Sequence, residues 1–171
     1  SKTGKTRTGK NGRFELNIPT PPAGGPYTLI FDDGSGNGEK TVLQNVLSGE
    51  VWICSGQSNM EFPIKGDWAQ LMDADEVVAT MQRPALRLLQ IRTTSSVNPL
   101  DDTDVEYGWA ESSPAAASFS AIGYLCGKML QDSLNVPVGI IDASWGGTSV
   151  EAWTPYEAVS YTHLTLPTIR L

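Results

Sequence analysis

Two glycine-containing turns hold the side chains of this 171-residue chain that are best suited to covalent chemistry. The apolar run 51–54 leads into the turn SGQSNM at 55–60, and the apolar run 138–143 leads into the turn SWGGTS at 144–149. A serine hydroxyl on a tight turn after a buried strand projects above its sheet, as in nucleophile turns. Paired glycines let a backbone approach a substrate and present N–H groups to a developing oxyanion. Ser58 is therefore a candidate nucleophile, and a Ser- and Asn-rich helix cap is the more common alternative for such a turn.

An alternating order of strands and helices places both turns at strand ends. We expect buried strands at 51–54, 86–91 and 138–143, and helices at 67–82 and 118–134. This order is typical of α/β folds, in which a parallel sheet is covered on both faces and ligands bind at the carboxyl ends of the strands. The apolar residues of the two helices that we expect in the core are Trp68, Leu71, Met72, Val78, Met81, Ile122, Leu125, Cys126, Met129 and Leu130.

Residues 1–48 have a different pattern, in which apolar and polar residues alternate with period two and Gly and Pro interrupt the alternation. The alternating apolar segments at 14–18, 27–31 and 41–46 predict antiparallel β-hairpins. We therefore expect residues 1–48 to be part of a small β-rich N-terminal domain. The five bases that precede residue 15 and the acidic stretch 101–111 are expected to be solvated surface.

The charge balance excludes several classes of partner. The chain has 19 acids against 12 bases, a net charge of −7 and a pI near 4.6. A phosphate backbone or an anionic membrane surface would repel it, so we expect no nucleic-acid partner. No apolar run approaches the roughly 18 residues of a membrane-spanning helix. Cys54 and Cys126 lack the spacing of a metal site or a disulfide framework, and we expect two buried thiols.

Both turns lie in longer stretches with a family likeness. GEVWICSGQSNMEFP at 49–63 resembles the nucleophile block of the sialate O-acetylesterases, members of the SGNH-hydrolase superfamily, and NVPVGIIDASWGGTSVEAW at 135–153 is similar to their second block. The likeness runs from about residue 6 to residue 154. It implies an SGNH-hydrolase-like three-layer α/β/α fold with a parallel sheet, incomplete here and preceded by part of a small antiparallel β domain. It implies no metal and no organic cofactor.

The resemblance also implies roles for residues of the two turns. Ser58 would be the nucleophile, its own N–H and that of Gly147 would be oxyanion-hole donors, and Gly146 would let the loop approach the acyl group. Ser58 would attack an acetyl ester on a sugar hydroxyl, an acetyl-enzyme would form, and water would release acetate. The implied partner is an O-acetylated sugar or glycan. Supporting positions are Gln57, Asn59 and Thr148.

The chain departs from the family pattern at the catalytic base. The family carries a His with an Asp in a D-x-x-H arrangement near the C-terminus, whereas the sole histidine here is His163, and Ser160 lies three residues before it. The segment VSYTHLTLPT from residue 159 looks like a translated sequencing adapter. We therefore expect 160–171 to be a foreign tail and 49–159 to be the N-terminal portion of an esterase domain. With His163 not expected to act as the base, the parent protein would be the esterase and this chain would be truncated and poorly active.

Other functions stay open on the residues alone. A non-catalytic carbohydrate-binding or structural module would fit the five tryptophans and the β-rich start, but it leaves both glycine turns unexplained. An acetylxylan-type esterase would share the chemistry and differ in substrate. Trp145 and Trp153 are expected to pack beneath the second turn, with a sugar-facing role as the alternative. A secreted or periplasmic location follows only from the expected substrate, and nothing indicates an oligomeric state.

The expected incompleteness of the sheet predicts poor solubility for the purified chain. Missing strands would leave an unpaired edge and exposed core residues, and both features promote association. Size-exclusion chromatography and thermal melting measure this directly. A monomeric elution with one cooperative melt would count against the interpretation.

Overall fold

The computed structural model describes residues 3–34, 40–96, 98 and 100–154. The backbone divides into two compact units, Ser1–Glu50 and Val51–Leu171. Each unit is described by itself below. No helix in the described ranges is long and apolar enough to span a bilayer.

The first unit contains a two-stranded antiparallel sheet. Its strands are β1, Gly24–Asp32, and β2, Lys40–Ser48, with Ile30 opposite Val42. The hairpin predicted from 27–31 and 41–46 is therefore confirmed. The prediction of a strand at 14–18 is wrong, because this segment pairs with no strand among the described residues, and Phe14 and Ile18 are exposed. Alternation alone supplies no backbone hydrogen-bond partner, which a strand requires.

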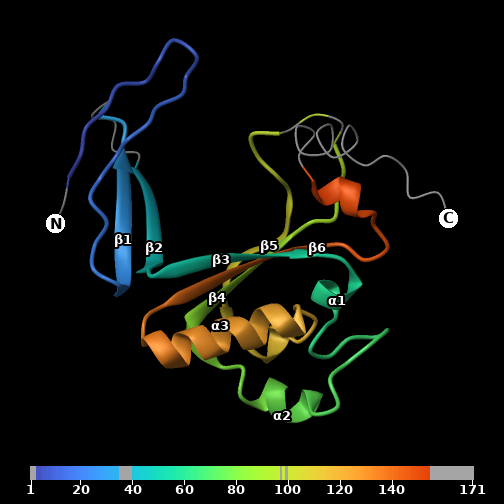
Figure 1. Ribbon diagram of the computed structural model, residues 1–171. Helices are drawn as coiled ribbons and strands as arrows, with labels where there is room; N and C mark the ends of the chain where they lie inside the picture. The colour runs from blue at the N-terminus through green and yellow to red at the C-terminus, as the bar shows by residue number, and fades with distance from the viewer. Residues whose placement is uncertain (1–2, 35–39, 97, 99, 155–171) are drawn as a thin grey trace. The chain divides into compact units, whose positions relative to one another are not determined.

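The second unit is an α/β arrangement built on a four-stranded sheet, with strand order β3-β6-β4-β5 (Figure 1). β4 and β6 are parallel, with Leu88 opposite Ile140, and they confirm two of the predicted strands. β5 is antiparallel to β4, so the sheet is mixed rather than wholly parallel. The bounds of the strands are Glu50–Gly56 for β3, Arg83–Ile91 for β4, Val105–Ser112 for β5 and Val138–Ser144 for β6.

β5 occupies most of the acidic stretch 101–111, for which the sequence predicts a solvated surface loop. The loop is wrong from residue 105 onward, whereas the expected exposure is confirmed for most of the stretch, with Tyr107 and Glu111 partly buried. Tyr107 explains the difference, because its ring packs against the core and lies 6.3 Å from that of Phe119. The packing of Tyr107 and the backbone hydrogen bonds to β4 stabilise a strand here despite the acidic side chains on either side of Tyr107.

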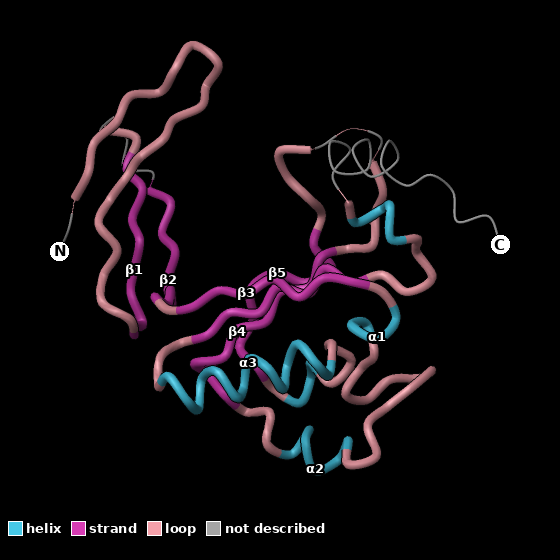
Figure 2. The backbone as a smooth tube through the Cα atoms, viewed as in Figure 1, coloured by secondary structure: helices cyan, strands magenta, loops and turns pink. Residues whose placement is uncertain are grey.

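Helices α2 and α3 lie on the same side of this sheet (Figures 1 and 2). The predicted helix at 67–82 is wrong over most of its length, since α2 covers only Ala74–Ala79. The Leu71 N–H donates to the Ile64 carbonyl at 3.0 Å, so the chain before α2 turns back on itself instead of following a helical path. Trp68 and Met72 are consequently exposed. The remaining helical segments are α1, Ser58–Glu61; α3, Ala121–Leu134; and the 3₁₀ turns η1, Pro114–Ala116, and η2, Val150–Trp153.

α3 confirms the predicted helix, but it buries a different face from the one expected. Ile122 and Met129 are 50% and 68% exposed, and Cys126 is also exposed. Leu125 and Leu130 are partly buried against the core. The residues that α3 buries are the small or aromatic ones, Ala121, Gly123, Tyr124 and Gly127.

Close approach of the helix to the sheet selects this face. A Cβ atom on Gly127 would lie 2.6 Å from Ile140 Cγ1 and 3.0 Å from Leu86 Cδ1. The glycine face therefore lets α3 come nearer to β4 and β6 than a face of large side chains would. The cap fits the same register, because the Ser120 hydroxyl oxygen accepts the Gly123 N–H at 3.0 Å.

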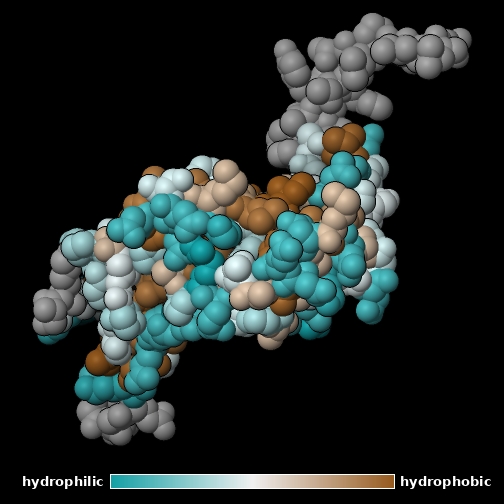
Figure 3. Space-filling view, turned by 90° about the horizontal axis from the view of Figure 1, so that it is seen from below, coloured by the Kyte–Doolittle hydropathy of each residue, from teal (hydrophilic) through white to brown (hydrophobic). Residues whose placement is uncertain are grey.

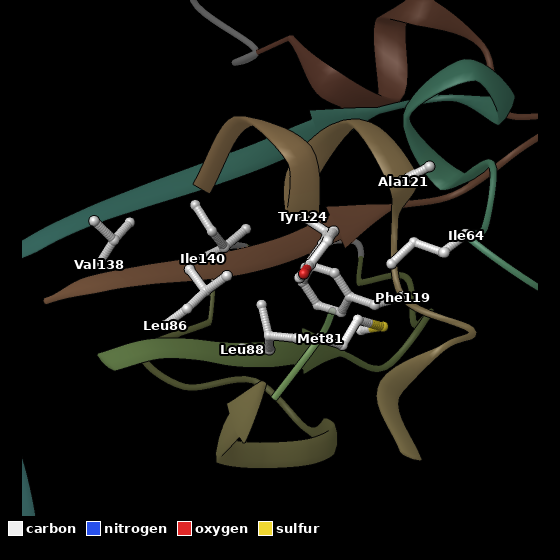
Figure 4. Packing of buried hydrophobic residues seen from close by; sticks show 9 residues of the cluster. All are labelled: Ile64, Met81, Leu86, Leu88, Phe119, Ala121, Tyr124, Val138 and Ile140. Atoms are coloured by element: carbon white, nitrogen blue, oxygen red, sulfur yellow. The ribbon is translucent and has the colours of Figure 1, made fainter. Parts of the chain in front are cut away.

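The core lies between α3 and the sheet (Figure 4). The prediction that residues 51–54 are buried on both faces is wrong, since Val51 and Ile53 are 60% and 68% exposed and β3 ends the strand order. From the side of α2 and α3, Figure 3 shows a mainly hydrophilic surface with hydrophobic residues in separate places. The buried cluster consists of Ile64, Met81, Leu86, Leu88, Phe119, Ala121, Tyr124, Val138 and Ile140.

Packing at Gly127 gives a stability prediction. We expect Gly127→Ala to lower the free energy of unfolding, because overpacking against the Ile140 and Leu86 side chains costs about 1–3 kcal/mol while alanine gains only about 1 kcal/mol in helix propensity. Gly108→Ala is the matched control, since nothing lies within 4 Å of a Cβ at that position. Denaturant unfolding checks both variants. A Gly127→Ala protein as stable as the Gly108→Ala protein would contradict this account of helix packing.

Candidate active site

The two turns meet because the strands before them, β3 and β6, are neighbours in the sheet. The Trp145 N–H donates to the Gly56 carbonyl at 2.9 Å, and the Gln57 side-chain amide donates to the Thr148 carbonyl. Gly56 has a φ of +145°, a conformation that glycine adopts without strain. Residues that are about 90 positions apart in sequence are thus joined directly by hydrogen bonds.

Ser58 lies against Gly146 of the other turn. A Cβ atom on Gly146 would lie 3.4 Å from both the Cα and the Cβ atoms of Ser58, and it would collide with Glu61 Oε2. Ser58 is the first residue of α1 and is exposed. The structure therefore brings together the predicted nucleophile and the predicted glycine loop, and leaves the serine accessible.

Two backbone N–H groups at this junction are open. Among the described residues, the N–H groups of Ser58 and Gly147 have no hydrogen-bond partner, and Gly147 adopts a φ of +75°. The Gly146 N–H, in contrast, donates to Glu61 Oε2 at 2.8 Å. The two open amides are those for which the family resemblance implies an oxyanion-hole role. Open amide donors next to an exposed hydroxyl can stabilise negative charge that develops on a carbonyl oxygen.

A chain of side-chain hydrogen bonds holds the second turn. The Trp153 indole N–H donates to Thr148 Oγ1 at 2.7 Å, and the Thr148 hydroxyl donates to the Trp145 carbonyl at 2.8 Å. Trp153 is half-buried, in line with the expected packing role. Trp145 is 37% exposed, so part of its indole faces solvent beside Gly146.

Asp142 is a buried carboxylate just before the second turn. It is 2% exposed, and its Oδ1 accepts the Ser144 N–H at 3.1 Å and the Ser144 hydroxyl at 2.6 Å. Burial raises the pKa of Asp142, hydrogen bonds from Ser144 and from the Ser120 N–H oppose the rise, and the charge of Glu61 adds to it. The Ser120 hydroxyl in turn donates to the Met60 carbonyl at 2.5 Å. Asp142 therefore links β6 to the start of α3 and, through Ser120, to α1, which agrees with a structural role.

Several predicted features fall outside this junction. Asn59 is exposed, and no described residue is a hydrogen-bond partner of its side chain, so no contact supports a bracing role. His163 and the expected tail at 160–171 lie outside the described residues. Within the described ranges, no group of three or more His, Cys, Asp or Glu side chains is placed to hold a metal ion.

The expectation of two buried thiols is wrong for Cys126 and is only partly met by Cys54. Cys54 is half-buried, and burial is the main cause that raises its pKa, with the Cys126 charge adding to the rise. Cys126 is exposed on α3, because the helix presents its glycines rather than this residue to the sheet.

Sequence reasoning missed Glu61. Ser58 and Glu61 have the S-x-x-E spacing of a capping box, in which the glutamate would return to the backbone at the start of its own helix. In the structure the residue at the N-cap is Gln57, with no side-chain cap, and the Glu61 carboxylate reaches Gly146 instead. The spacing was visible in the sequence, whereas the partner on a distant turn was not.

The raised pKa of Asp142 predicts a pH dependence of stability. Between the ordinary value of 3.8 and the raised folded-state pKa, the folded protein retains a proton that the unfolded chain releases, so this group's contribution to stability falls as pH rises. The wild type should therefore lose stability relative to Asp142→Asn as the pH rises above about 4, measured by denaturant unfolding. Asp132→Asn is the control of opposite sign, because Lys128 and Arg83 lower the pKa of Asp132 and its contribution is lost as pH falls. If the stability difference from the wild type changed with pH in the same direction for both variants, the raised pKa of Asp142 would be contradicted.

Comparison with known proteins agrees with this geometry. A crystal structure of a carbohydrate acetylesterase from Xanthomonas citri aligns with a TM-score of 0.78 and 35% identity, covering 88% of this chain and 33% of the other. Curated sialate O-acetylesterases from Mus musculus and Homo sapiens are 34% and 32% identical over 142 residues, which is 77% of this chain and 25% and 26% of theirs. The chain thus spans about a quarter of the length of these relatives.

A match to a protein-family model identifies the family of the chain. The model described as "Carbohydrate esterase, sialic acid-specific acetylesterase" matches residues 48–166. The match includes both glycine turns, and its last seven residues lie in the segment for which the sequence predicts a foreign origin. The chain therefore belongs to the family of carbohydrate esterases described as sialic acid-specific acetylesterases.

Proposed function

We propose that this chain carries the nucleophile half of a carbohydrate O-acetylesterase, with Ser58 as the nucleophile. The observation that carries the proposal is the contact of the exposed Ser58 with Gly146, the residue that precedes the open N–H group of Gly147. Family membership supports the reaction class.

The proposed reaction is acyl transfer in two steps. Ser58 Oγ attacks the carbonyl carbon of an acetyl ester, and its proton passes to a general base. The N–H groups of Ser58 and Gly147 stabilise the tetrahedral oxyanion, the sugar leaves as an alcohol, and water then releases acetate from the acetyl-serine. Removal of one such donor typically costs about 10²–10³ in kcat.

The general base comes from outside the described residues, which contain no histidine. Asp142 is unsuited to the task because it is buried and its carboxylate is occupied by Ser144 and Ser120. We infer that the whole protein supplies a His–Asp pair from another segment, and that residues 1–171 alone turn over slowly. Loss of triad members typically lowers kcat by about 10⁴–10⁶-fold.

The proposed substrate class is an acetylated sugar. The Xanthomonas citri neighbour is a carbohydrate acetylesterase, and the curated relatives are sialate O-acetylesterases. The partly exposed Trp145 beside Gly146 offers an apolar indole surface on which a sugar ring can pack. Acetylated sialic acid and acetylated xylan share the ester that reacts, so the reaction class is independent of the choice between them. A secreted or periplasmic location would follow from such a substrate.

One set of observations favours a second candidate, a non-catalytic carbohydrate-binding module. Trp52, Trp68 and Trp109 are 49%, 62% and 49% exposed, and exposed tryptophans are common in sugar-binding surfaces. A binding module of this kind would leave the junction of the two glycine turns without a function.

Labelling with a fluorophosphonate distinguishes the two functions. We expect slow labelling of Ser58 in the 171-residue chain, because the oxyanion donors retain part of the reactivity when the base is absent. Tandem mass spectrometry of the tryptic peptide 41–65 locates the adduct. The adduct should disappear in Ser58→Ala and persist in Ser55→Ala, which removes an exposed serine of the same turn.

The rival outcome is equally specific. Saccharide binding that Ser58→Ala leaves unchanged, with no labelling of Ser58, would support the binding module and refute the esterase proposal. An adduct on Ser55 in place of Ser58 would refute the assignment of the nucleophile.

A further inference from the structure

Glu61 is anchored in the same turn as the proposed nucleophile. It lies three residues after Ser58 on α1, and its backbone N–H donates to the Gln57 carbonyl at 3.0 Å. The residue is half-buried, so its side chain has little freedom to leave the junction. No hydrogen bond joins the Glu61 carboxylate to the Ser58 hydroxyl among the described residues.

The carboxylate instead reaches the second turn. Glu61 Oε2 accepts the Gly146 N–H at 2.8 Å, across 85 positions of sequence. The bond removes one N–H of the glycine pair from the site and leaves that of Gly147 open. The bond joins α1 to the second turn directly, so it is well suited to fix the orientation of the loop.

The space around Gly146 reinforces the same constraint. A Cβ atom there would collide with Glu61 Oε2 and would touch Ser58. The loop is therefore confined between the carboxylate and the serine. A rotation of this loop would displace the Gly147 N–H and break the bond between the Gly146 N–H and Glu61 at the same time.

We propose that Glu61 is a positioning residue, which holds the Gly146 N–H so that the Gly147 N–H faces the Ser58 hydroxyl. This inference rests on the proposed function for its catalytic meaning, but the contact itself can be tested without any reaction. Glu61 acts through its acceptor oxygen, and an amide oxygen at the same place can do the same.

The test compares Glu61→Ala, Glu61→Gln and the control Glu76→Ala, which removes an exposed glutamate from α2. Amide NMR and hydrogen exchange on the 171-residue chain report directly on Gly146 and Gly147. We expect Glu61→Ala to speed exchange at Gly146 by about 10-fold or more and to shift the Gly147 resonance, while Glu61→Gln restores most of the protection. Unchanged exchange at Leu88 and Ile140 shows that the sheet is intact in each variant.

Labelling of Ser58 by a fluorophosphonate gives the second readout. Glu61→Ala should slow it by about 10–100-fold, because misplacement of a donor by about 1 Å has effects of that size, and Glu61→Gln should recover most of the loss. Unchanged Gly146 exchange in Glu61→Ala overturns the inference. So does a Glu61→Gln protein as impaired as Glu61→Ala, since it would show that the charge itself is required. If Ser58 is not labelled in the unaltered chain, the proposed function fails, and the Gly146 and Gly147 amides still decide the role of Glu61.

Discussion

The close approach of two backbones at Gly146 is the constraint on which the site depends. Strands β3 and β6 are neighbours, so the turns that follow them meet, and a Cβ atom at position 146 would displace the Glu61 carboxylate and touch Ser58. Hydrogen bonds from Trp145 to Gly56 and from Gln57 to Thr148 lie on either side of this contact. The sheet places the two turns side by side, and the absence of a side chain at Gly146 lets the second turn lie against Ser58.

Polar groups beneath the junction carry an energetic cost. Asp142 is buried with a raised pKa, which means that the folded state disfavours its charged form. The cost is offset locally by the Ser144 hydroxyl and backbone N–H and by the Ser120 N–H, while the Ser120 hydroxyl continues the network to α1. An apolar residue at 142 would avoid the desolvation but would disconnect α3 from the end of β6. The network thus lowers the stability of the fold somewhat, but it fixes β6, α3 and α1, which carry or adjoin the two turns, relative to one another.

The sequence predicted those features that depend on local pattern, and failed where distant contacts decide. Apolar runs located β4 and β6, and turn chemistry located both glycine turns. The helix expected at 67–82 shrinks to α2 because the Leu71 N–H finds the Ile64 carbonyl, a bond that no periodicity reveals. α3 turns its glycines to the sheet because helix–strand distance, rather than side-chain volume, sets the buried face. Glu61 was overlooked for the same reason, since its partner Gly146 is distant in sequence.

The Ser58 side chain takes no part in holding this junction together. Among the described residues its hydroxyl makes no hydrogen bond, whereas the bonds that join the turns belong to the backbone of residues 56, 145, 146 and 148 and to the side chains of Gln57 and Glu61. The Ser58 hydroxyl and the N–H groups of Ser58 and Gly147 therefore all lack a hydrogen-bond partner among the described residues. Folded proteins pair most polar groups that water does not reach, so the unsaturation is tolerable only where solvent or a ligand completes it. Ser58 and Gly147 are both exposed, so water can reach these groups, and in the proposed function a substrate carbonyl oxygen takes the place of that water.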